Sequence, residues 1–162
     1  MNILIAVDSV EFNKVIAEFV NSHDWSSETN FRIVHVIEPA LLNESEIAFL
    51  PFLNDLVENE KITSTQLVSD MAKRIDTANV NSAHVSTEVV EGHASDLIVQ
   101  LAREWQADML LVGSHGRKGM TRFVLGSVSS SVVALSPCSV VVLRLPITSK
   151  ITENQESVIT SL

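Results

Sequence analysis

Short strand-like segments alternate along the chain with stretches in which apolar residues recur every three or four positions. The strand-like segments lie at residues 3–7, 31–37, 85–89, 109–112 and 140–143. A continuous apolar run such as Ile3–Val7 is typical of a strand that is buried on both faces, as in a parallel sheet. The periodic stretches between these segments indicate helices with one apolar face, at residues 12–20, 53–75, 94–105 and 128–135.

This alternation predicts the fold class. Strands that alternate with helices form βαβ crossovers, which make the strands parallel. We expect an α/β fold: a single open doubly wound five-stranded parallel sheet with helices on both faces, similar to the Rossmann fold. Residues 41–51 are ambiguous, because Pro51 interrupts a helix yet suits a helix's first turn. The pattern stops after Pro146, so we expect one domain over residues 1–145 and a flexible tail over residues 146–162.

Charge and cysteine content narrow the function classes. The chain has 162 residues and a formal net charge of −9, from 11 basic and 20 acidic side chains. This charge argues against general binding to nucleic acids and to anionic membranes. No segment approaches the roughly 18 apolar residues of a membrane span, and no basic residue precedes the first apolar run. The one cysteine, Cys138, is expected to be a small buried side chain rather than a redox centre, and we expect a cytoplasmic protein.

The segment from Gly113 to Val128 carries the candidate chemistry. It joins the end of the fourth predicted strand to the fourth predicted helix, with the spacing G-x2-G-x9-G-S at Gly113, Gly116, Gly126 and Ser127. Glycines let backbone N–H groups approach oxygen atoms closely, and a helix N-terminus attracts anions. No acidic residue lies between Asp108 and the end of the fifth predicted strand, and three basic residues fall in the segment: Arg117, Lys118 and Arg122. The pattern therefore predicts a site for a small polyanion.

A second candidate group follows the first predicted strand. In an open α/β sheet, ligands bind beyond the carboxyl ends of the strands, where the strand order reverses. Asp8 and Gly113 both follow strand ends, so they face one crevice if the first and fourth strands are neighbours. Capping of the first helix is the alternative role for Asp8. For His115, inside the glycine segment, contact with phosphate and simple exposure to solvent both stay open.

The glycine spacing resembles that of the universal stress protein family, in its ATP-binding subgroup. The resemblance covers roughly residues 1–145 and includes Asp8, Val36 and the last strand, Val140–Leu143. It implies an ATP-binding regulatory protein of the stress response, with Mg²⁺ or Mn²⁺ held between phosphate oxygens and no metal ligand from protein side chains. It also implies a homodimer formed through the last strand. The chain departs from the family's pattern at Val10, where serine is common, and at Ala6, where some relatives have proline.

The residue roles implied by this resemblance fall into two halves of one site. Asp8 would bind the ribose or the base edge, Val36 would contact adenine mostly through its backbone, and Val112 would flank the base or ribose. The phosphates would lie against the glycine segment and the helix start, at Gly113, Gly116, Arg117, Gly126, Ser127 and Val128.

Two further functions stay open beside ATP-dependent regulation. One is slow ATP hydrolysis, in which Arg117 or Lys118 would stabilise developing charge. Against it, the glycine motif contains no carboxylate to orient a water molecule. The other is a binding module for a different adenine nucleotide, such as a cyclic or monophosphate one. We expect no catalytic residue, and none of the five histidines has the spacing of a metal site.

Overall fold

The computed structural model describes residues 1–39, 50–75, 84–115 and 125–146. This part of the chain contains one sheet with the strands β1 (Asn2–Ala6), β2 (Asn30–Ile37), β3 (Val85–Glu91), β4 (Met109–Gly113) and β5 (Ser139–Leu143). Its helices are α1 (Val10–Asn21), α3 (Leu50–Arg74), α4 (Ala94–Glu104) and α5 (Ser127–Leu135). The alternation of strands and helices predicted from the sequence is confirmed.

The sheet has the strand order β3-β2-β1-β4-β5, and every neighbouring pair is parallel. From β1, the chain adds β2 and β3 on one side of this strand, and then crosses over to add β4 and β5 on the other side of β1. The strand order therefore reverses between β1 and β4, which pair from Ile3 with Met109 to Ala6 with Val112. The doubly wound parallel fold is confirmed, and its switch point lies between these two strands.

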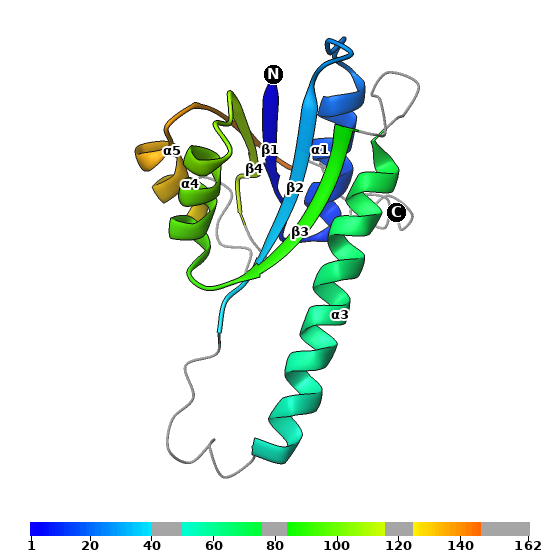
Figure 1. Ribbon diagram of the computed structural model, residues 1–162, viewed down its shortest axis with the longest axis vertical. Helices are drawn as coiled ribbons and strands as arrows, with labels where there is room; N and C mark the ends of the chain where they lie inside the picture. Colours follow the sequence, from blue (N-terminus) through cyan, green and yellow to red (C-terminus); the bar gives the residue numbers. More distant parts are fainter. Residues whose placement is uncertain (40–49, 76–83, 116–124, 147–162) are drawn as a thin grey trace, which may run out of the picture.

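Helices cover both faces of the sheet (Figure 1). On one face α1 and α3 pack over Ile3, Ile5 and their neighbours, and on the other face α4 and α5 pack over Leu4. Successive side chains of a strand point to opposite faces, so each strand contributes to both core clusters. This arrangement explains why β1 has a continuous apolar sequence instead of an alternating one.

Ser9 is the N-cap residue of helix α1, directly before Val10. It has extended backbone angles, φ −146° and ψ 158°, and its Oγ accepts a hydrogen bond from the Phe12 backbone N–H at 3.5 Å. Hydrogen bonds from the Glu11 backbone N–H and, to a smaller extent, from the Ser9 hydroxyl lower the pKa of the Glu11 carboxyl below its ordinary value. The capping role considered for Asp8 therefore belongs to Ser9.

Helix α3 is the longest helix of the described chain, at 25 residues, and has Pro51 in its first turn. Its second half packs on the sheet through Leu67, Val68 and Met71, which are at most 8% exposed. Residues 55–63 are exposed, and this first half of the helix extends beyond the carboxyl edge of the sheet (Figure 1). Residues 41–49 of the ambiguous segment lie outside the described residues.

Three further sequence expectations concern a membrane span, Cys138 and the C-terminal tail. No helix in the described ranges is long and apolar enough to cross a membrane. Cys138 is half-buried, packs against the core cluster under α4 and α5, and has its Sγ 3.4 Å from the Ser136 Oγ. The predicted tail beyond Pro146 lies outside the described residues.

Candidate functional site

The carboxyl edge of the sheet brings together predicted site residues from distant parts of the chain. Ala6, the last residue of β1, pairs with Val34 of β2 on one side and with Val112 of β4 on the other. Asp8 follows Ala6 by two residues, and Val36 follows Val34 by two residues. Asp8 therefore leaves the sheet between the ends of β2 and β4, and the neighbouring of β1 and β4 that was the condition for Asp8 and Gly113 to share a crevice is met.

Two hydrogen bonds tie the start of α5 to the end of β4. The backbone N–H of Gly126 donates to the carbonyl oxygen of Ser114 at 2.8 Å. The hydroxyl of Ser129, which is 5% exposed, donates to the carbonyl oxygen of Gly113 at 2.6 Å. The two ends of the glycine segment are thus joined, and the N-terminus of α5 is held at the carboxyl edge of the sheet.

The N-terminus of α5 and the adjacent His115 suit an anionic ligand. Gly126 is the N-cap of this nine-residue helix, and no side chain caps its first turn. Uncapped N–H groups at a helix start, together with the helix dipole, attract phosphate groups. The Nδ1 of His115 lies 3.0 Å from the Ser114 hydroxyl, while its Nε2 is buried without a hydrogen-bond partner among the described residues. These features fit a phosphate at this edge.

Gly113 has a packing role that its motif alone does not reveal. A Cβ atom at this position would lie 2.7 Å from the Cγ and Cδ1 atoms of the Phe12 ring. Phe12 belongs to α1 and is 5% exposed, so the ring is enclosed by the core. Among the described glycines only Gly92 has a positive φ, so close packing, not backbone conformation, requires glycine at position 113.

His35 contacts the segment that leads to Asp8, and sequence reasoning did not single it out. This β2 residue is 2% exposed, and its Nδ1 lies 2.7 Å from the carbonyl oxygen of Val7. Because a carbonyl oxygen only accepts hydrogen bonds, Nδ1 carries the proton and donates it to this bond. A histidine inside the apolar segment of residues 31–37 was the available signal, because a buried polar side chain requires a partner.

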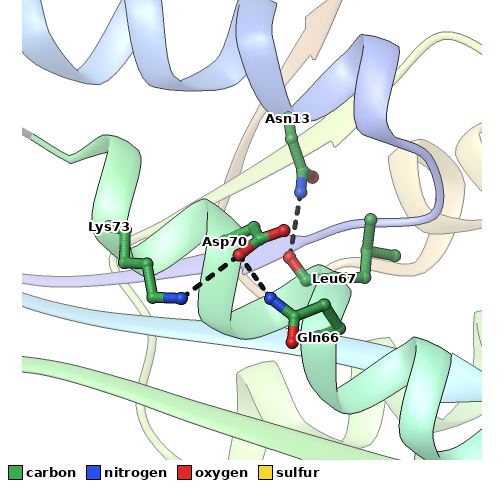
Figure 2. Close-up of polar contacts among 5 residues, drawn as sticks. All are labelled: Asn13, Gln66, Leu67, Asp70 and Lys73. Carbon is green, nitrogen blue, oxygen red and sulfur yellow. Dashed lines mark hydrogen bonds and ion pairs between the residues drawn. The ribbon is translucent and has the colours of Figure 1, made fainter.

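Asp8 also borders a hollow of about 520 Å³ between the start of α1 and the middle of α3. This Asp8 hollow is lined by Asp8, Ser9, Val10, Glu11, Ile62, Thr63, Gln66, Leu67 and Asp70. Figure 2 shows polar contacts of three of these lining residues, Gln66, Leu67 and Asp70. The Leu67 carbonyl oxygen accepts a hydrogen bond from the Asn13 amide at 3.0 Å, which joins α1 to α3. The Asp70 carboxylate accepts hydrogen bonds from Gln66 at 2.7 Å and from Lys73 at 3.4 Å. One side of Asp8 thus faces open volume.

The other predicted residues divide between the core, the surface and the undescribed part of the chain. Val112 is 4% exposed, and Val36 and Val128 pack against the same core cluster under α4 and α5. Ser127 is exposed at the helix start. Gly116 and Arg117 lie outside the described residues. Within the described ranges, no three side chains of His, Cys, Asp or Glu gather as metal ligands.

Comparison with solved structures gives the same fold. The universal stress protein UspA from Lactobacillus plantarum has a TM-score of 0.69 and 24% identity, over 89% of this chain and 97% of that chain. A universal stress protein in complex with cAMP has a TM-score of 0.63 and 20% identity, over 90% and 98%. An Arabidopsis thaliana universal stress protein family protein with AMP bound has a TM-score of 0.60 and 16% identity, over 91% and 93%.

Sequence comparison assigns the family. A putative universal stress protein of Staphylococcus epidermidis is 30% identical over 149 residues, which span 88% of this chain and 83% of the relative. The sequence pattern of the universal stress protein family matches residues 1–144, which include every strand and helix described above. The resemblance first suggested by the glycine spacing is therefore confirmed at the level of the family. This chain belongs to the universal stress protein family.

Proposed function

We propose that this protein is a nucleotide-binding regulatory protein of the stress response that holds ATP at the carboxyl edge of β1 and β4. The observation that carries the proposal is the tied start of α5, where the Gly126 N–H bonds to Ser114 and leaves an uncapped helix N-terminus beside the end of β4. Related structures hold AMP and cAMP, which supports an adenine nucleotide as the ligand class.

The two halves of the proposed site have different chemistry. On the phosphate side, Ser127 and Val128 at the start of α5 would offer backbone N–H donors. Gly113 and Gly126 would let the backbone approach the phosphates closely, and Gly116 and Arg117 would complete the cradle. On the nucleoside side, Asp8 offers a carboxylate for a ribose hydroxyl or a base amine, with Val36 and Val112 as flanking residues. Mg²⁺ or Mn²⁺ would enter with the phosphates and neutralise part of their charge.

Calorimetric titration tests this proposal on protein stripped of bound nucleotide. We expect ATP with Mg²⁺ to bind with micromolar affinity, and Gly126→Ala to weaken binding at least tenfold (about 1.4 kcal/mol). The backbone angles at Gly126, φ −60° and ψ 159°, are open to alanine, so this variant adds a methyl group without backbone strain. Ser130→Ala is the matched control, because its exposed hydroxyl lies in the same helix outside the proposed cradle. Absence of ATP, AMP and cAMP binding in the unmodified protein contradicts the proposal.

The same protein answers two neighbouring questions. Titration of ATP, AMP and cAMP in parallel identifies the preferred nucleotide. A turnover assay for phosphate release separates nucleotide sensing from slow hydrolysis, and release that survives in a Gly126 and Ser127 double variant indicates a contaminating enzyme.

A homodimer through β5 is the second part of the proposal. In the described sheet β5 is an edge strand, and its residues Val140–Leu143 are only half-buried. A valine-rich edge strand presents unpaired backbone groups that a second copy can pair with. Sedimentation at micromolar concentration is expected to show a dimer, and a monomer there contradicts this part.

We place the protein in the cytoplasm, on the ground of its single cysteine.

A further inference from the structure

We infer that His35 is a positioning residue for the nucleoside half of the proposed site. It fixes the Val7–Asp8 peptide against the end of β2, and so sets where Asp8 lies relative to Val36. This inference rests on the proposed function, and it assigns a role to a residue that lies outside the glycine motif.

The strand ends explain why a fixing contact is needed here. The β1–β2 pairing ends at Ala6 and Val34, while β2 continues to Ile37 and stays paired with β3. Beyond Ala6, the Val7 N–H still donates to the Val34 carbonyl oxygen at 2.9 Å. The Val7 carbonyl oxygen accepts a hydrogen bond from the Nδ1 of His35 at 2.7 Å. Val7, the residue before Asp8, is therefore held by β2 through both its N–H and its carbonyl oxygen.

Burial gives this contact its importance. Val7 is 4% exposed and His35 is 2% exposed, so water does not readily replace the imidazole as partner of the carbonyl. An unpaired carbonyl in such surroundings costs free energy, and the chain relieves this cost by moving toward solvent. Asp8 is the next residue, and Ser9 after it begins α1. Movement at Val7 would therefore displace the carboxylate that the proposed site presents to the nucleoside.

The position of Nδ1 provides a matched pair of variants. In His35→Asn, the amide nitrogen stands the same number of bonds from the backbone as Nδ1 and keeps the donor. In His35→Leu, a methyl group stands in that place and the donor is lost. Both variants remove the Nε2 side of the ring, so the difference between them isolates the hydrogen bond to Val7.

The experiment measures amide hydrogen exchange in the nucleotide-free protein and AMP affinity by calorimetry. In His35→Leu we expect exchange at the Val7 N–H to accelerate about tenfold and AMP affinity to fall about tenfold, the effect of one hydrogen bond. The Gly126 N–H, which bonds to Ser114 at the other end of the site, serves as internal reference and should be unchanged. His35→Asn should restore both readouts to within about threefold of the unmodified protein.

Each outcome has one meaning. Equal behaviour of the two variants overturns the positioning role, because the donor then has no effect. Acceleration at Val7 and Gly126 together overturns it as well, since the loss is then a general loosening of the fold. If the unmodified protein binds no AMP, ATP or cAMP, the proposed function fails and the nucleoside role of His35 fails with it, whatever the exchange rates show.

Discussion

Replacement of Gly113 by alanine should destabilise the fold through one contact with the Phe12 ring. The added Cβ would lie 2.7 Å from two ring carbons and 3.0 Å from a third. Carbon atoms in contact normally lie about 3.5–4.0 Å apart, so the overlap is roughly 1 Å. Overpacking of this kind costs about 1–3 kcal/mol, offset by about 0.4–1 kcal/mol from the stiffer unfolded chain. Because the Phe12 ring is enclosed by the core, we take the cost from the middle of its range and expect a net loss of about 1–2 kcal/mol.

Urea and thermal unfolding measure this loss, and a double-mutant cycle assigns it to the ring. For a chain of this size, 1–2 kcal/mol corresponds to a fall in melting temperature of roughly 2–8 °C. Phe12→Ala removes the Cγ and Cδ1 atoms that the added methyl group would meet, and it will itself destabilise the core. In that background Gly113→Ala should be neutral or slightly stabilising, with a coupling free energy of about 1–2 kcal/mol between the two sites.

The opposite results refute the packing argument. If Gly113→Ala leaves the unfolding free energy unchanged, the ring accommodates a methyl group without strain. If the loss is the same with and without Phe12, its cause is the backbone of Gly113. The doubly substituted protein is useful in either case, because its ATP affinity reports whether position 113 also needs glycine for the ligand.

Three further substitutions test a hydrogen bond, a helix cap and a backbone conformation. Ser129→Ala removes the 2.6 Å hydrogen bond to the Gly113 carbonyl oxygen and should cost about 1–2 kcal/mol by urea unfolding; an unchanged midpoint contradicts this. Ser9→Ala removes the N-cap of α1, which should cost about 1 kcal/mol. The Ser9 hydroxyl also lowers the pKa of Glu11, so an NMR titration of this variant should show that pKa moving back toward 4.5. In the unmodified protein, the stability that the Glu11 contact contributes is present above pH 4.5 and is lost as pH falls through the lowered pKa. Gly92→Ala, at φ +150° with a Cβ 2.8 Å from a Leu97 methyl carbon, should lower the melting temperature more than Ser9→Ala does.

The fold was predictable because both faces of the sheet are covered. Burial on both faces makes β1 continuously apolar from Ile3 to Ala6, and this distinguishes it from the periodic helices even in a single sequence. Neighbouring of β1 and β4 was a conditional expectation, because strand order depends on contacts between segments more than a hundred residues apart. The pairing of Ile3 with Met109 is such a contact.

The candidate site could be proposed from the sequence only where the local sequence carries its chemistry. Gly126 and Ser127 stand at a strand-to-helix junction, and a short spacing motif is enough to find them. The roles of Phe12 and Ser129 arise from contacts with Gly113 that form when α1 and α5 pack on the sheet. A single sequence does not state which helix side chain will meet which strand end, so these residues read as ordinary core and helix positions.

The ties at the carboxyl edge have a common consequence for ligand binding. Ser129 holds Gly113, Ser114 holds Gly126, and His35 holds the peptide before Asp8, in each case through a hydrogen bond within the protein. Groups that are already fixed lose little conformational entropy when a ligand arrives, so less of the interaction energy is spent on ordering them. Because each tie lies outside the atoms that would touch a nucleotide, substitution at His35 or Ser129 should weaken affinity by loosening the free protein. The bound nucleotide should bring a displaced Asp8 carboxylate back into place, so crystal structures of such variants with nucleotide bound should show the ligand contacts unchanged.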